Sequence, residues 1–191
     1  IRDMKRDGIE LQSSSLSSIS GNFINNCGEP AITLYNSSYA TVENNTLIDI
    51  KWGILTRNAT SLAVSNITGG GMYLSRSSSS SVSGNLIKNC ADKAIALLTL
   101  TDVTVENNTL VDSMWGIFSE DTTSLVVRNM KEDGMHLRDT AMSSIRGNSI
   151  NNCEDPAISL YYSSHITVEN NTLVDSKWGI ESVNAISLAV R

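Results

Sequence analysis

The chain has 191 residues, 40% of them hydrophobic, and a formal net charge of −6. The negative charge argues against nucleic-acid binding, because a protein that contacts phosphates needs a basic surface. No uninterrupted apolar stretch approaches the ~20 residues of a membrane-spanning helix, so we expect no membrane span. Aromatic residues make up only 5% of the chain, which predicts an aliphatic core.

The sequence repeats with a strict 63-residue period. The segment ENNTLIDIKWGI at 43–54 recurs as ENNTLVDSMWGI at 106–117 and as ENNTLVDSKWGI at 169–180. The three cysteines and the three tryptophans follow the same period: Cys27, Cys90 and Cys153, then Trp52, Trp115 and Trp178. A strict period of this length is typical of array architectures. We therefore expect one β-solenoid over 1–191, with units at about 8–70, 71–133 and 134–191.

Each unit divides into three turns. A small residue followed by an aliphatic one marks a corner in every turn: Gly8, Ala31, Gly53, Gly71, Ala94, Gly116, Gly134, Ala157 and Gly179 hold the small residue. Successive corners are 23, 22 and 18 residues apart, and this order repeats along the chain. The spacing predicts about nine turns.

Three short apolar runs follow one another in each turn. The first follows the corner, as in residues 9–11 and 32–34. The second carries an aliphatic residue at one position of every turn: Ile19, Val42, Val64, Val82, Val105, Val127, Ile145, Val168 and Val190. The third follows an asparagine: Ile24, Leu47, Ile67, Ile87, Leu110, Met130, Ile150 and Leu173. The apolar residues alternate with a period of two, and Gly, Asn and Ser residues separate the runs, which predicts short strands. Three strands per turn predict an all-β parallel β-helix.

An asparagine is expected to end the second strand of successive turns. These residues are Asn22, Asn45, Asn66, Asn85, Asn108, Asn129, Asn148 and Asn171. Asparagine tolerates the left-handed backbone of a tight bend. Stacked amides can also hydrogen-bond along the axis, as in other stacked β-structures. We interpret the asparagines as a structural ladder, not as ligand-binding residues.

The runs DGIELQSSSLSSISGNFI at 7–24 and PAISLYYSSHITVENNTLV at 156–174 carry a family resemblance. They resemble the right-handed parallel β-helix repeats of the NosD type, also known as carbohydrate-binding and sugar hydrolysis repeats, found in archaeal and bacterial surface and periplasmic proteins. The resemblance implies the fold over the whole chain. It leaves function open, since the superfamily includes lyases, hydrolases, epimerases, adhesins and structural stalks.

The repeated cysteines are predicted to be buried, unbridged thiols. Equivalent residues of successive units lie three turns apart, which is roughly 14 Å at the usual strand spacing. A disulfide needs Cα atoms within about 7 Å. We therefore expect the thiols to pack as small hydrophobic side chains.

No catalytic residue, metal site or cofactor is predicted. Acidic residues recur at Glu43, Glu106 and Glu169, and at Asp49, Asp112 and Asp175. Paired carboxylates serve glycoside hydrolysis, and stacked ones can bind Ca²⁺, but repetition in every unit favours a solvated surface. His136 and His165 lack metal-ligand spacing and are expected to be solvated. The basic residues fall at different positions of their turns, which indicates no catalytic cluster: Arg57, Arg76, Lys93, Lys131 and Arg138.

The tryptophans are the candidate binding residues. Trp52, Trp115 and Trp178 each precede a Gly-Ile corner and would form a row at about 14 Å intervals. Three roles stay open: covering a corner, contacting another subunit, or stacking on sugar rings. Candidate glycosylation sites are Asn36, Asn58 and Asn66, each of which begins an Asn-X-Ser/Thr sequon.

The chain starts at IRDMKRDGI and stops at ISLAVR, both within the same kind of turn. Neither end shows the atypical capping segment that solenoids use. We expect an excerpt of a longer array, or copies that stack end to end or side by side. The leading hypothesis is a structural β-solenoid segment of an extracellular surface protein or filament, such as a stalk, sheath or adhesin scaffold. The alternative is a carbohydrate-binding or polysaccharide-degrading β-helix protein whose catalytic part lies outside this segment.

Overall fold

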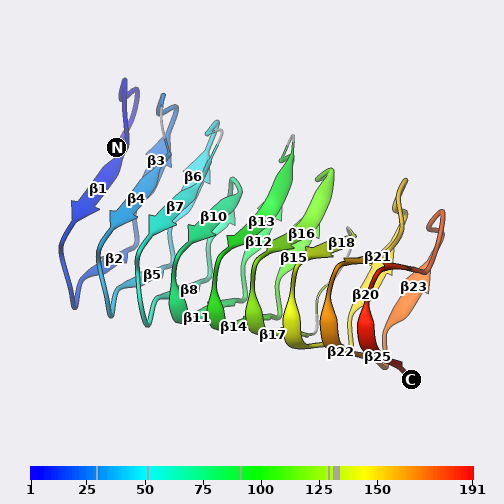
Figure 1. Cartoon of the computed structure of the whole chain (residues 1–191). Coiled ribbons are helices and arrows are strands. Elements are labelled where there is room, and N and C mark those ends of the chain that lie inside the picture. Colours follow the sequence, from blue (N-terminus) through cyan, green and yellow to red (C-terminus); the bar gives the residue numbers. More distant parts are fainter. Residues whose placement is uncertain (29, 51, 91, 129, 131–133) are drawn as a thin grey trace.

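The chain forms a parallel β-helix in the computed structural model, which describes residues 1–28, 30–50, 52–90, 92–128, 130 and 134–191. The turns stack in chain order along one axis, and the described residues contain strands but no helix (Figure 1). Neighbouring strands within each sheet come from successive turns and pair in parallel. The predicted all-β solenoid is therefore confirmed.

Two continuous sheets run the length of the molecule, with nine strands each. The first sheet contains β1 (Ile9–Gln12), β4 (Ile32–Tyr35), β7 (Ile54–Arg57), β10 (Met72–Ser75), β13 (Lys93–Leu98), β16 (Trp115–Glu120), β18 (Met135–Arg138), β21 (Ile158–Tyr161) and β24 (Ile180–Val183). The second contains β2 (Ser18–Ser20), β5 (Thr41–Glu43), β8 (Ala63–Ser65), β11 (Ser78–Ser83), β14 (Thr101–Glu106), β17 (Thr123–Arg128), β19 (Ala141–Arg146), β22 (Ser164–Glu169) and β25 (Ile186–Val190).

The third side of the helix is a shorter and interrupted sheet. Its strands are β3 (Phe23–Asn25), β6 (Thr46–Ile48), β9 (Thr68–Gly69), β12 (Leu86–Lys88) and β15 (Thr109–Val111), followed by the pair β20 (Ser149–Asn151) and β23 (Thr172–Val174). The structure thus has about eight three-sided turns, after which β24 and β25 begin a further one.

The register reproduces the predicted turn lengths. Ile9 pairs with Ile32, Ile32 with Ile54, and Ile54 with Met72. These steps equal the corner spacings expected from the sequence, and the same order repeats through β24. The short turns have fewer residues in the loop between the third side and the next strand of the first sheet. The loop before β10 therefore projects less than the loops before β7 and β13 (Figure 1).

The core is the aliphatic column enclosed by the three sheets. Ile32, Leu34, Val42 and Ile54 are among its fully buried members. Burying them supplies the main driving force for folding, at roughly 25 cal/mol per Å² of apolar surface. Thr56 stands in the short turn at the position that Leu34 holds in the preceding one.

Each cysteine packs against a corner glycine. The Sγ atoms of Cys27, Cys90 and Cys153 lie 3.4, 3.3 and 3.4 Å from the point where a Cβ would be attached to Gly8, Gly71 and Gly134, respectively. None of the three takes part in a disulfide, as predicted. The regular spacing of the cysteines therefore follows from packing, because each thiol covers a glycine of the shorter loop beneath it.

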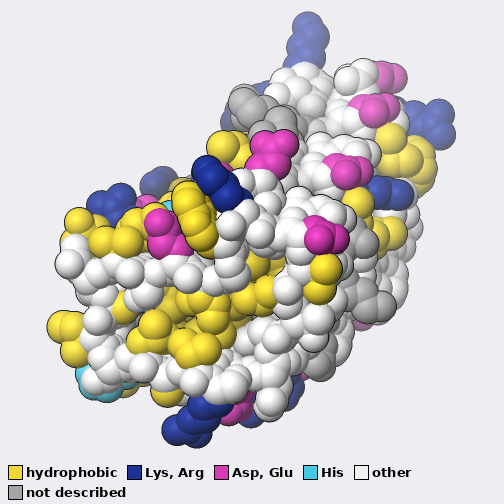
Figure 2. All heavy atoms as spheres, turned by 90° about the vertical axis from the view of Figure 1, so that its right-hand side faces the viewer, with side chains coloured by type: hydrophobic (Ala, Val, Ile, Leu, Met, Phe, Trp, Pro, Cys, Tyr) yellow, Lys and Arg dark blue, Asp and Glu magenta, His cyan; other side chains and the backbone are white. Residues whose placement is uncertain are grey.

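The end of the molecule that carries the last turns differs from its sides. Figure 2 shows hydrophobic side chains spread over the end that carries the last turns. Ile186 and Val190 of β25 are 66% and 56% exposed there. No described segment forms a helix long and apolar enough to cross a membrane.

Candidate functional site

The asparagines form hydrogen bonds between neighbouring turns. Asn108 Oδ1 accepts hydrogen bonds from the backbone N and from Nδ2 of Asn85, at 3.0 and 2.8 Å, while Asn108 Nδ2 donates to Val82 O at 2.9 Å. The pairs Asn22 with Asn45 and Asn148 with Asn171 repeat this arrangement. Four of these residues are buried with their amides satisfied: Asn45, Asn85, Asn108 and Asn148.

The ladder is interrupted in the short turns of the first two units. Thr68 N bonds to Asn45 O, and Ile67 N bonds to Asn85 Oδ1, so Ile67 occupies the ladder position of its turn. The prediction that Asn66 belongs to the ladder is therefore wrong. Met130 likewise donates its backbone N–H to Asn148 Oδ1, and Asn129 lies outside the described residues. An apolar residue takes this place in the short turns.

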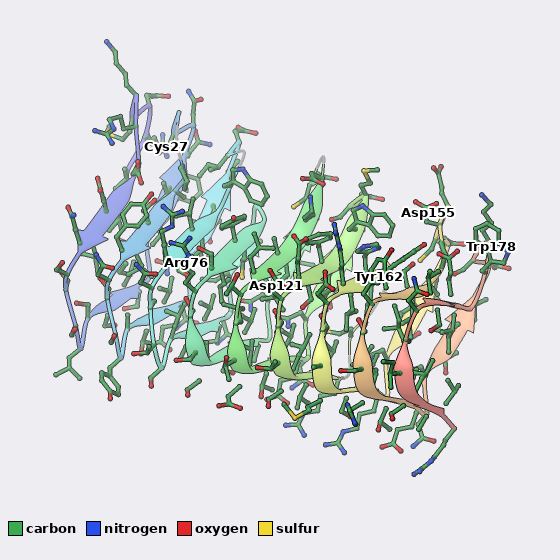
Figure 3. The ribbon with its side chains drawn as sticks, viewed as in Figure 1. Cys27, Arg76, Asp121, Asp155, Tyr162 and Trp178 are labelled. Carbon is green, nitrogen blue, oxygen red and sulfur yellow. The ribbon has the colours of Figure 1, made fainter. Side chains whose placement is uncertain are left out.

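The tryptophan row is not uniform. The rings of Trp52 and Tyr73 meet edge to face with centroids 5.9 Å apart, and Trp115 contacts His136 at 5.1 Å. Trp178 is 52% exposed beneath the ammonium group of Lys177. It lies at the far end of the helix from Cys27 (Figure 3). The first two tryptophans therefore reach over the outer face of the first sheet toward a ring on the adjacent strand.

An aromatic stack occupies the same outer face. His136 on β18 stacks on Phe118 of β16 with centroids 5.3 Å apart, and on Tyr161 of β21 at 5.2 Å. The Tyr161 hydroxyl donates to the Glu181 carboxylate, and this bond raises the pKa of Tyr161. Burial lowers the pKa of His136 below its usual value, and the nearby Arg138 guanidinium acts in the same direction.

One sequence-based expectation is wrong here. His136 is half-buried between rings rather than solvated, and its Nδ1 atom is buried without a partner in the described part of the structure. Two of the basic residues, Lys93 and Arg138, lie on this outer face, where Lys93 Nζ is 4.9 Å from the centre of the Phe118 ring. Arg138 also pairs with Glu120 at 3.4 Å. Lys131 lies outside the described residues. The stacked sheet brings these groups together although they occupy different positions in their turns.

The stack stops at Ala96 of β13. Ala96 pairs with Tyr73 on one side and with Phe118 on the other, so a methyl group stands where its neighbours carry rings. A groove of about 290 Å³ results, lined by Trp52, Tyr73, Asp92, Lys93, Ala96, Leu98, Phe118 and Glu120. We call it the Ala96 groove.

The rim of the Ala96 groove carries positively and negatively charged side chains. Lys93 Nζ lies 4.9 Å from the centre of the Phe118 ring and 2.8 Å from the Asp92 carboxylate. Glu120 stands on the far strand beside Phe118. The groove therefore offers ring surface together with hydrogen-bond donors and acceptors, the combination found in small-molecule sites.

The remaining predicted surface positions lie on the sides of the helix. Glu106 pairs across turns with Arg128, at 2.5 Å. Asn36, Asn58 and Asn66 are exposed and have φ angles of 49°, 55° and 53°. Asn58 Nδ2 also donates to Asn36 Oδ1 at 2.9 Å. Glycosylation at these sites stays a prediction.

A family model described as "Periplasmic copper-binding protein (NosD)" matches residues 1–68 and 29–182. The chain belongs to the NosD family. No curated protein matches it in sequence.

Solved structures similar to this NosD-family chain are β-helix proteins of low sequence identity. The Azotobacter vinelandii mannuronan C-5 epimerase AlgE4 A-module is 13% identical, with a TM-score of 0.62 over 86% of this chain and 63% of that one. The Streptococcus pneumoniae surface adhesin PfbA is 13% identical, with a TM-score of 0.53 over 90% of this chain and 62% of that one. The chain thus spans less than two thirds of either protein, and the likeness establishes the fold.

The family description raises the question of copper, which the described residues do not fit. They contain no group of three or more His, Cys, Asp and Glu side chains that could hold a metal ion. The cysteines are one to a unit, each placed against a glycine, and His136 is held between two rings. No step of any reaction is therefore assigned to copper in this chain.

Sequence reasoning named the tryptophans as candidate binding residues, which stays a prediction, but it did not predict the Ala96 groove. The groove depends on Tyr73, Ala96 and Phe118, which come from three successive turns. Aligning the first-sheet strands by turn rather than by repeat unit would have placed these residues side by side.

Proposed function

We propose that this NosD-family chain is a carbohydrate-binding β-helix and that sugar rings bind in the Ala96 groove. The observation that carries the proposal is the groove itself, in which Trp52, Tyr73 and Phe118 surround a gap left by an alanine. A pyranose ring has apolar C–H faces and a hydroxyl edge. The aromatic side chains would contact the faces, while Lys93, Asp92 and Glu120 would bond the hydroxyls.

The charge of the chain favours a neutral polysaccharide. A net charge of −6 would repel a polyanion at long range. Trp115 and Trp178 lie further along the same side and would extend the binding surface toward the last turns. The name of one similar protein, a surface adhesin, supports a surface role. We also propose that the protein is extracellular or periplasmic.

Titration calorimetry with neutral oligosaccharides chosen from a glycan array tests the site. Phe118→Ala and Trp52→Ala are expected to weaken binding by about tenfold or more, since each removes a ring from the groove. Phe23→Ala is the matched control, because Phe23 is exposed on β3 of the third sheet. Equal affinities for all three variants, or no binding to any glycan, would refute the proposal.

A second candidate function is a rod segment that stacks with copies of itself. The near-identical 63-residue units favour it, because each unit packs on the next in register and further copies would continue the same stacking. Stacked copies would give fibres with an axial repeat of about 43 Å, which is nine strand spacings. Electron micrographs and sedimentation at increasing concentration test this. A monomer at all concentrations would exclude it.

A further inference from the structure

The short turn opens a cleft on the third side of the β-helix, distinct in its lining from the Ala96 groove. The cleft measures about 500 Å³ and is lined by Thr46, Leu47, Ile48, Asp49, Ile50, Thr68, Gly69, Gly70, Lys88, Asn89 and Cys90. β9 lies between β6 and β12 but ends at Gly69. Beyond that residue, the continuations of β6 and β12 face each other across two strand spacings, about 9.6 Å.

Backbone hydrogen bonds show what is missing from the cleft. In the long turns, the residue after the third strand donates its N–H to the next turn: Asn26 to Ile48 O at 3.1 Å, Asn89 to Val111 O at 3.0 Å, and Asn152 to Val174 O at 3.1 Å. The equivalent N–H of Asp49 has no acceptor in the described part of the chain. The equivalent acceptor on the other side of the cleft is the backbone carbonyl oxygen of Lys88. Among the described residues, its one recorded hydrogen-bond contact is with the Cys90 thiol, at 3.9 Å.

The geometry points to an extended peptide segment of a partner protein as the ligand of this cleft. Such a segment would lie parallel to β6 and β12 and take the place of the missing strand. One of its carbonyls would accept from Asp49 N–H, and the N–H of its next residue would donate to Lys88 O. Addition of a strand to exposed backbone edges is an established mode of peptide recognition.

The backbone also restricts the sequence of the segment. The residue that follows the third strand in every long turn has a positive φ of 50–57° and is an asparagine or aspartate: Asn26, Asp49, Asn89, Asp112, Asn152 and Asp175. The partner residue that donates to Lys88 O would occupy this position. It is therefore expected to be Asn, Asp or Gly, the residues that tolerate a left-handed backbone.

Amide hydrogen exchange of the 191-residue chain tests the inference. The probe is the acetylated and amidated peptide Val-Asp-Ser-Met, copied from residues 111–114 of a long turn. In the unbound chain, Asp49 N–H should exchange faster than Asn26 N–H, which is paired. Saturating peptide should slow Asp49 exchange by about fivefold or more, the effect of one net hydrogen bond, and leave Asn26 unchanged.

Two controls separate a bound strand from other contacts. The same peptide with an N-methylated aspartate lacks the donor for Lys88 O and should bind at least about fivefold more weakly. A chain in which residues 111–115 are copied between Gly69 and Gly70 fills the cleft from within and should not bind the peptide.

Four results would overturn the inference. They are slow exchange of Asp49 before peptide is added, no change at millimolar peptide, equal protection by the methylated peptide, and protection that rises with protein concentration alone. The last result would assign the cleft to a second copy of the chain. All of these measurements are independent of sugar binding.

Discussion

Asn108→Ala should be one of the most destabilising single substitutions in this chain. Asn108 has no exposed surface and accepts two hydrogen bonds from Asn85, one from its backbone N–H and one from its side chain. Its own side chain donates to Val82 O. Alanine would leave these groups without partners in an interior that water does not reach.

The expected cost follows from the groups left unpaired. A buried donor or acceptor without a partner costs about 1–3 kcal/mol. Three such groups, of which Asn85 can relax one, predict a loss of about 3–5 kcal/mol in the free energy of unfolding. That is a large part of the roughly 5–15 kcal/mol typical of folded domains.

Urea unfolding followed by far-ultraviolet circular dichroism measures the loss. Asn22→Ala is the matched control, because Asn22 belongs to the same ladder but is partly exposed and is an end member. Its loss should be within about 1 kcal/mol. A cost below about 1 kcal/mol for Asn108→Ala, or equal costs for the two variants, would refute the role assigned to the buried amides.

Three further outcomes are expected. Thr56→Val should raise the free energy of unfolding by about 1 kcal/mol, because Thr56 Oγ1 is buried without a hydrogen-bond partner in the described structure; an unchanged or lower urea midpoint would contradict this. Gly71→Ala should lower the free energy of unfolding by about 1–3 kcal/mol, because the new Cβ would lie 2.8 Å from a carbonyl oxygen. Gly179→Ala should be tolerated, because the nearest atom to its Cβ would be 3.7 Å away. Similar melting temperatures for the two variants would count against the packing argument. The folded chain should lose stability as pH falls through 6.5, the usual pKa of histidine, because burial lowers the pKa of His136 and the unfolded chain then binds more protons; His136→Phe should flatten this part of the pH profile, and an unchanged slope would show that other groups cause it.

The outer face of the first sheet combines repetition with local exceptions. Trp52 and Trp115 occupy equivalent positions of successive units, and so do Tyr73 and His136, the rings that they contact. Phe118 has no aromatic counterpart, since Leu55 holds the equivalent position in the first unit. The repeat thus supplies the scaffold for the aromatic face, and departures from the repeat create the Ala96 groove.

Several features could be predicted because they depend on residues close together in the chain. Corner spacing fixed the register of every turn, since a small residue followed by an aliphatic one is required wherever the chain enters the first sheet. The cysteines were correctly predicted to be unbridged, because a period of three turns keeps them apart. The ladder assignment failed at Asn66, since a short turn shifts the asparagine by one residue relative to the strand.

By itself, the sequence determined the fold, the turn lengths and the absence of disulfides among the cysteines, because strand alternation and a strict period leave one way to bury the aliphatic residues. Only the tertiary structure decided which side chains meet across turns. Stacking at a strand spacing of about 4.8 Å places Tyr73, Ala96 and Phe118 side by side although they come from three different turns. The same stacking separates β6 from β12 where β9 ends, and it thereby creates a cleft that no local pattern in the sequence describes.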